Sequence, residues 1–325
     1  MTRYRPVKVL LMIAMLVSIL SFSSSKRPEY MPQPRWYVYV PTGTMFNEDG
    51  KNVSINAFWM SWTEITNAQY KEYLADVDST MPHTKPDTSM LNSQLWINKY
   101  KDYFTYSMFD DFPVVGLSKE QMENYALWRG EQYRKENPEW EGKFRLPTKE
   151  EWQYAASGGR QSQEFPWGES FYRNSKGCNL MHFFDLDQRF AVYGDEGASK
   201  VLYRNDISDS LASAEYSKMT VATKSFKKLK RRHFGKGLPY LAMPVPADSY
   251  FPNDYGLYGM SGNAAEFTVD GEVLGGSYKT AAEYCKIRGA KPYPFDASKP
   301  QSDVGFRLVC SNEGYTYSRT EEIEE

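Results

Sequence analysis

The fold is specified most clearly by residues 144–159, which read FRLPTKEEWQYAASGG. Pro147 precedes Thr148, and Glu151 follows that threonine at the spacing of a capping box. In such a box the threonine hydroxyl accepts from the amide of Glu151, and the glutamate side chain accepts from the amide of Thr148. The glycine pair 158–159 is typical of a helix end. We therefore predict a short, well-capped helix in this segment.

The same helix-start pattern occurs twice earlier in the chain, in Thr66-Asn-Ala-Gln69 and in Ser118-Lys-Glu-Gln121. Apolar residues at helical spacing follow each pattern, so each predicts a helix. Two alternating segments predict strands, namely WYVYVP (36–41) and VSINAFWMS (53–61). Regular signals become rare in residues 160–255, which predicts an irregular, loop-rich region.

The composition is that of an ordinary globular protein. The chain has 325 residues, and its 39 Lys and Arg are balanced by 41 Asp and Glu, which gives a net charge of −2. This balance excludes a globally basic protein that binds nucleic acid. Hydrophobic residues make up 41% and charged residues 25%, so the chain is not disordered as a whole.

The N-terminus has the pattern of an export signal. Arg3, Arg5 and Lys8 are followed by the apolar run Val9–Phe22 and then by serines. The run is shorter than the ~20 residues that span a bilayer, so we predict a signal peptide at residues 1–25. An uncleaved N-terminal anchor is the alternative. We expect the mature chain to be exported, to the periplasm or to the outer membrane.

The cysteines are Cys178, Cys285 and Cys310. Their odd number allows at most one intrachain disulfide, and the sequence leaves the pairing open. Their spacing matches no zinc motif, and the histidines are scattered. We expect no zinc site.

A long insertion at about residues 185–248 carries a strongly basic run. Its cations are Lys224, Lys227, Lys228, Lys230, Arg231, Arg232 and Lys236. Such a run is either a solvated loop or a docking patch for an anionic partner, for example an acidic protein subunit, peptidoglycan or lipopolysaccharide. The acidic residues 313–325 are expected to form a frayed tail.

Several segments, taken in order, resemble the formylglycine-generating-enzyme, or sulfatase-modifying-factor, domain. They are TEITNAQYKEYL (63–74), FRLPTKEEWQYAASGG (144–159), FPWG (165–168), NDYGLYGMSGNAAEF (253–267), LGGSY (274–278) and SDVGFRLV (302–309). The resemblance covers residues 36–312, after a lead-in at 26–35. It implies a single irregular, loop-rich α+β domain of C-type-lectin-like topology.

The resemblance also implies where chemistry would take place. Enzymes of this family oxidise a cysteine of a sulfatase to formylglycine with copper(I) held by two thiolates, because soft Cu(I) prefers sulfur. The family pattern places those thiols at the positions of Thr280 and Cys285, after Ser277. A hydroxyl does not replace a thiolate for Cu(I). We therefore expect no copper and no oxidase activity, with Ser277, Thr280 and Cys285 as vestiges of the site.

The resemblance implies two calcium sites as well, because hard oxygen ligands suit Ca²⁺. The first set comprises the carbonyls of Gly259, Gly262 and Ala264 and the carboxylate of Glu266. The family usually has Asn where Gly259 stands, so one side-chain ligand is missing. The second, weaker set comprises Asn179, Leu180 and Glu196. The alternative for Glu266 is a carboxylate that caps amides of its own loop.

One subgroup of the family is more similar than the enzymes. RNSKGCNL (173–180) and SYFPNDYGLYGMSGNAAEF (249–267) are similar to the GldK, PorK and GldJ proteins of gliding motility and type IX secretion in the Bacteroidota. That similarity implies a non-catalytic building block of the envelope, bound to partner subunits and forming a homo-oligomer or ring. The usual lipid-anchor cysteine after the signal peptide is absent, and the chain is short for that group.

Two other functions stay open. A divergent metal-dependent oxidase would use Cys285 and Ser277. A lectin-like ligand-binding receptor is the second alternative, because GGSY (275–278) and VGFRLV (304–309) also resemble the C-termini of variable proteins diversified by retroelements.

Overall fold

The computed structural model describes residues 33–77, 85–89, 103–138, 140, 142–161, 163–168, 170–175, 179–183, 243–290, 292–293 and 299–311, and the backbone of 191–193 and 201–203. The chain divides into two units, Met1–Gln33 and Pro34–Glu325, and the fold belongs to the second. Several predictions fall outside the described residues, namely the signal peptide, Cys178, Glu196, the basic run 224–236 and the tail 313–325.

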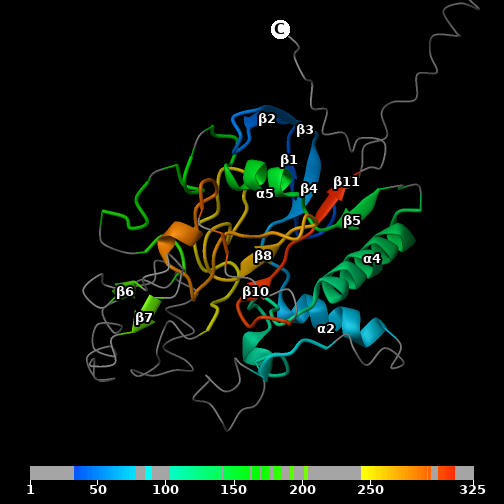
Figure 1. Cartoon of the computed structure of the whole chain (residues 1–325). Helices are drawn as coiled ribbons and strands as arrows, with labels where there is room; N and C mark the ends of the chain where they lie inside the picture. The colour runs from blue at the N-terminus through cyan, green and yellow to red at the C-terminus, as the bar shows by residue number, and fades with distance from the viewer. Residues whose placement is uncertain are drawn as a thin grey trace, which may run out of the picture. The chain divides into compact units, whose positions relative to one another are not determined.

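The largest sheet has four strands in the order β1-β4-β11-β5. β1 (Tyr37–Val40) pairs antiparallel with β4 (Phe58–Ser61), and β11 (Val309–Ser311) lies between β4 and β5 (Lys143–Arg145). The last strand of the described fold is therefore built between segments from the beginning and the middle of the chain (Figure 1).

Smaller sheets surround it. β2 (Gly43–Phe46) and β3 (Asn52–Ile55) form a hairpin, so the extended signal at 53–61 covers two strands, β3 and β4. β8 (Ala265–Phe267) pairs antiparallel with β9 (Val273–Leu274) and parallel with β10 (Val304–Gly305). β6 (Ala191–Tyr193) and β7 (Val201–Tyr203) pair within the insertion.

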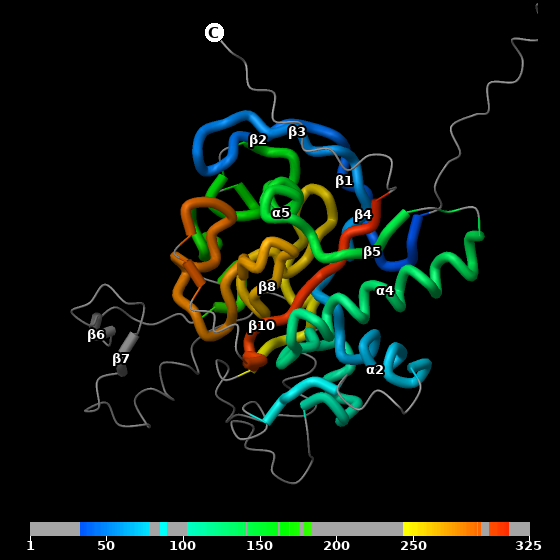
Figure 2. Tube along the Cα trace, turned by 45° about the vertical axis from the view of Figure 1, so that its right-hand side comes forward, coloured from blue at the N-terminus to red at the C-terminus, as the bar shows by residue number. Residues whose placement is uncertain are grey.

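All three predicted helices are confirmed, each with its capping box. They are α2 (Asn67–Asp76), α4 (Lys119–Glu136) and α5 (Lys149–Ala156). The N-caps are Thr66, Ser118 and Thr148. Helices α2 and α4 pack against each other, as Figure 2 shows. Short 3₁₀ turns occur at η3 (Ser107–Phe109) and η6 (Ala282–Tyr284).

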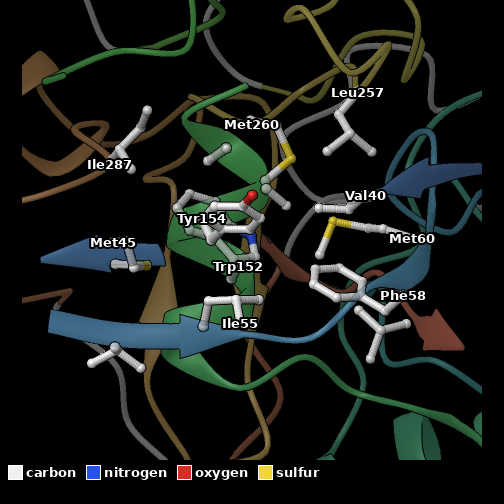
Figure 3. Packing of buried hydrophobic residues seen from close by; sticks show 14 residues of the cluster. Val40, Met45, Ile55, Phe58, Met60, Trp152, Tyr154, Leu257, Met260 and Ile287 are labelled. Carbon is white, nitrogen blue, oxygen red and sulfur yellow. The ribbon is translucent and has the colours of Figure 1, made fainter. Parts of the chain in front are cut away.

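The core is centred on α5. Trp152 is fully buried and lies with Tyr154 between the β2–β3 hairpin and the loop that carries Leu257 and Met260 (Figure 3). The inner face of the large sheet closes this cluster with Met60 and other apolar side chains. The loop-rich α+β fold is as predicted, and its loops carry the residues of the candidate site. Among the described residues, no helix combines the length and the apolar character needed to span a membrane.

Candidate functional site

The residues predicted to be vestigial lie in the Ser277 loop (residues 275–285), which follows β9 and includes η6. Gly276 has a left-handed φ of 66°, and a Cβ there would lie 2.5 Å from Cys285 Sγ. Glycine therefore lets the loop fold back onto that thiol. As a result Ser277, Thr280 and Cys285 are brought together, and all three are buried.

The Thr280 hydroxyl is used inside its own turn. Its Oγ1 accepts from the Ser277 amide at 2.8 Å and donates to the Ser277 carbonyl at 3.2 Å. Oγ1 also lies 3.9 Å from Cys285 Sγ. Thr280 thus faces the thiol of Cys285 with an oxygen atom.

The Cys285 thiol is a packed group. It lies in an apolar cluster with Phe165, Met181 and Phe183. Burial raises the pKa of Cys285 to about 12, so the thiol keeps its proton at neutral pH. Because the thiolate is the form that attacks electrophiles, the metal-free thiol should react slowly with them in the folded chain. One protonated sulfur beside a hydroxyl does not fit copper(I).

The structure also bears on the disulfide prediction. Cys285 and Cys310 are both free and buried, so they are not joined to each other. Cys178, the third cysteine, lies outside the described residues.

The Ser277 hydroxyl belongs to a polar network that the sequence analysis missed. Its Oγ donates to Asp303 Oδ2 at 2.9 Å. The hydroxyl of Tyr293 lies 2.8 Å from Ser277 Oγ and 2.5 Å from Asp303 Oδ2. Lys279 Nζ lies 3.5 Å from Asp303 Oδ1. Burial, and then the Asp303 charge, raise the pKa of Tyr293 well above its usual value, so the phenol acts as a donor. The network orients the serine and gives the Asp303 carboxylate several donors.

His182 is held as a neutral donor. Its Nε2 donates to the carbonyl of Met243 at 3.0 Å, and its ring stacks on Tyr278 at 6.2 Å between centroids. Burial lowers the pKa of His182 to about 4. A neutral imidazole whose Nε2 proton is bound to a backbone oxygen supports the fold of this region.

The Glu266 carboxylate, predicted as a calcium ligand, is already bound to protein groups. Oε2 accepts from Arg307 Nε at 2.5 Å and from Trp152 Nε1 at 2.6 Å, and Oε1 accepts from Arg307 Nη2 at 2.6 Å. These partners come from α5 and from the segment between β10 and β11, whereas the sequence alternative placed them in the loop of Glu266 itself. As placed, the residues do not fit a calcium ion bound through Glu266.

Two side chains that the sequence analysis did not single out complete the Glu266 cluster (Glu64, Asn263, Glu266 and Arg307). Asn263 Nδ2 donates to Glu64 Oε1 at 3.0 Å, while Glu64 Oε2 has no hydrogen-bond partner in the described structure. Burial and the neighbouring Glu266 raise the pKa of Glu64 to about 8, although Arg307 lowers it. Glu64 is therefore mostly protonated at neutral pH.

The other residues of the first predicted calcium site, Gly259, Gly262 and Ala264, lie in the segment directly before β8. A Cβ on Gly259 would lie 2.4 Å from Glu64 Oε2, and one on Gly262 would lie 2.3 Å from the His182 carbonyl oxygen. Both glycines have left-handed φ values, 65° and 78°. Ala264 is buried in the apolar cluster around η3. Close packing therefore explains the small residues at these positions.

The second calcium set stays a prediction. Asn179 Oδ1 accepts from Arg173 Nε at 3.1 Å, and the Leu180 amide donates to the Tyr172 carbonyl at 2.9 Å. Glu196 lies outside the described residues. Within the described part of the chain, no three His, Cys, Asp or Glu side chains are grouped as a metal site would require.

Comparison with known proteins gives relatives of two kinds. The formylglycine-generating enzyme of Bos taurus is 23% identical over 314 residues, which covers 81% of this chain and 68% of the relative. The inactive C-alpha-formylglycine-generating enzyme 2 of Bos taurus is 41% identical over 64 residues, which covers 20% of this chain and 17% of the relative. The second similarity therefore concerns one short stretch.

Solved structures are similar at low identity. PvdO from Pseudomonas aeruginosa is 16% identical with a TM-score of 0.47, covering 88% of this chain and 100% of that one. Treponema denticola variable protein 1 is 15% identical with a TM-score of 0.43, covering 84% and 94%. At these values neither structure bears on function. Residues 26–312, most of the chain, match the Sulfatase-modifying factor enzyme 1-like domain, and the chain therefore belongs to this family.

Proposed function

We propose that this chain is a non-catalytic assembly protein of the bacterial envelope, which uses the sulfatase-modifying-factor fold as a binding scaffold. The observation that carries the proposal is the contact of Thr280 Oγ1 with Cys285 Sγ at 3.9 Å. By the family resemblance, these two residues stand at the positions where the enzymes hold copper(I) with two thiolates. A threonine hydroxyl is a hard oxygen, and Cu(I) selects soft sulfur, so the metal that the oxidation needs has no pair of ligands here.

The rest of the Ser277 loop supports the same conclusion. An oxidase needs a reactive sulfur that meets substrate, whereas Cys285 is fully buried and its pKa is raised to about 12. The Ser277 hydroxyl is equally enclosed and is bound to Asp303 and Tyr293. Both groups are arranged to support the loop.

The relatives are compatible with a protein that keeps the family fold but does not catalyse the oxidation. The bovine inactive enzyme 2 is described by its name as inactive, and it matches one stretch of this chain at 41% identity. For that stretch, the similarity supports a scaffold function. The bovine formylglycine-generating enzyme matches far more of the chain, but at 23% identity. The local chemistry of Thr280 therefore weighs more than either match.

The site of action is proposed from sequence features. The N-terminal signal pattern supports export to the periplasm or outer membrane, and segments 173–180 and 249–267 support a place in a gliding-motility or type IX secretion-like machinery. The basic run 224–236 suits an acidic partner subunit, because charge complementarity speeds encounter and fixes register. In this setting the chain acts as a repeated subunit in a homo-oligomer or ring.

A peptide oxidation assay tests the negative half of the proposal. The mature chain, loaded with Cu(I) under oxygen, should not convert a sulfatase-type Cys-x-Pro-x-Arg peptide to formylglycine. Mass spectrometry detects the aldehyde, and Cys285→Ser is the matched control. Aldehyde formed by the wild type above that control would establish the oxidase alternative and refute the proposal.

A binding assay tests the positive half. Capture of an acidic envelope subunit by the mature chain should fall steeply from low to high salt, because charge attraction is screened over ~8 Å at physiological ionic strength. A variant with Glu at Lys227, Lys228, Arg231 and Arg232 should lose that capture. The control variant reverses exposed cations elsewhere, at Lys51, Arg134, Lys135 and Lys143. Equal capture by both variants and the wild type would show that the run is only a solvated loop.

A further inference from the structure

Glu266 and Arg307 form a bidentate ion pair inside the protein. The Arg307 fork donates to both carboxylate oxygens, at 2.5 and 2.6 Å, and the two side chains are 0% and 1% exposed. The indole of Trp152 adds a further hydrogen bond at 2.6 Å. Fork-to-fork bonds between charged groups are among the strongest hydrogen bonds in proteins, so this carboxylate is firmly held.

Two further donors of Arg307 bind backbone oxygens. Nη1 donates to the Ser61 carbonyl at 3.1 Å, and Nη2 donates to the Tyr258 carbonyl at 2.8 Å. A carboxylate and backbone carbonyls, gathered from separate segments around one positive charge, are also the ligands that a hard cation takes. The guanidinium therefore joins β4, β8 and the turn before Gly259, as a bound ion at this place would do.

Position 259 gives an independent reason. A Cβ on Gly259 would lie 2.4 Å from Glu64 Oε2. The Glu64 side chain thus occupies the space that a ligand from position 259 would need.

We infer that Arg307 is the built-in cation of the Glu266 cluster, and that the cluster joins β4, β8 and the turn at residues 258–262 without calcium. Within it, the Arg307 guanidinium directly faces the Glu266 carboxylate, and both side chains are buried. A divalent ion on Glu266 would lie close to the guanidinium, and like charges repel strongly at short range away from water. The inference concerns the fold and is independent of the proposed function.

Terbium luminescence tests the cluster in the full chain. Tb³⁺ binds calcium sites, and an ion on Glu266 would be excited by Trp152, whose indole is bound to that carboxylate. We expect the wild type and Trp152→Phe to give the same emission when Tb³⁺ is added. Emission from the wild type that calcium displaces, and that Trp152→Phe abolishes, would overturn the inference.

Thermal melting gives a second readout. The wild type should melt at the same temperature in calcium and in EDTA. Arg307→Lys keeps the charge but loses the planar fork, so its Tm should fall by the same number of degrees in both solutions. A rise in the wild-type Tm with calcium that Glu266→Gln removes would contradict the inference. The terbium test stands even if Glu266→Gln fails to fold.

Discussion

Replacing Glu64 by glutamine removes one titratable group from the Glu266 cluster and leaves its shape nearly unchanged. The amide of Glu64→Gln can still accept the hydrogen bond that Asn263 Nδ2 makes to Oε1 in the wild type. It also resembles the protonated form of the acid, which is the form that the cluster favours. The change should therefore be close to neutral in acid and stabilising in mild alkali.

The sign follows from where the proton is bound. The pKa of Glu64 rises from 4.5 in the unfolded chain to about 8 in the folded one, so between these values only the native chain keeps the proton. The stability that this proton contributes is fully present below pH 4.5. It is lost as the pH rises to about 8, by up to about 1.4 kcal/mol for each pH unit.

His182 opposes this trend in acid. Burial lowers its pKa from 6.5 to about 4, so its contribution to stability is lost as the pH falls through that range. Above pH 6.5 this opposing effect ends. The window from pH 6.5 to 8 therefore isolates Glu64, and across it the wild type should lose about 2 kcal/mol.

Urea unfolding at several pH values within this window measures the effect. The stability difference between Glu64→Gln and the wild type should grow by about 2 kcal/mol from its lower to its upper end. Glu123→Gln, which removes an exposed carboxylate on α4, is the control and should not show this growth. If Glu64→Gln and the wild type change in parallel, Glu64 is ionised in the native protein and the argument from burial fails.

Three further predictions follow from single residues. Thr280→Cys puts a second sulfur about 3.9 Å from Cys285 Sγ, so the reduced variant should gain Cu(I) affinity in a competition assay, and Thr280→Val should not. Native Cys285 should be alkylated at pH 8 at least about 10³-fold more slowly than in urea, because its pKa is raised from 9.0 to about 12; equal rates would refute its burial. Gly262→Ala should cost more stability than Gly271→Ala. A Cβ at 262 meets the His182 carbonyl at 2.3 Å, whereas the one at 271 meets nothing within 4 Å and bears only the left-handed penalty of about 1–2 kcal/mol. Equal losses in urea unfolding would contradict the packing argument.

The helices could be predicted because their signals are local. Thr66, Ser118 and Thr148 each form a hydrogen bond with the residue three positions ahead, so each capping pattern is complete within four consecutive residues. The sheet could not be predicted in the same way. Its strands are short, and β11 finds its partners in β4 and β5, which lie far back along the chain. Pairings of this kind depend on tertiary packing, which leaves no local pattern to read.

The candidate site also has residues that could be predicted from the sequence and residues that could not. Ser277, Thr280 and Cys285 lie in one short loop, and family spacing sufficed to find them. Glu64 was missed because its position as a buried acid depends on Asn263, which lies 199 residues further on. Tyr293 was missed for a similar reason, since its partners are Ser277 and Asp303. Glu64 does lie in the segment 63–74 that carries the family resemblance, but its polar neighbours give no local sign that this acid is buried.

The two buried polar centres differ in what a substitution does to them, and this difference supports the proposed function. In the Glu266 cluster, removal of Arg307 would leave an uncompensated buried charge, which costs about 3–5 kcal/mol in comparable pairs. At the Ser277 loop, Thr280 stands at a position where the family resemblance implies a thiol, and its hydroxyl finds a donor and an acceptor in its own turn. This hydroxyl satisfies its hydrogen bonds locally and leaves the core around Cys285 packed. A hydroxyl at position 280 is therefore tolerated with little effect on stability, whereas a change in the Glu266 cluster is not. Under the proposed function, the fold would keep its surfaces and loops for binding although it lacks a pair of thiols at positions 280 and 285.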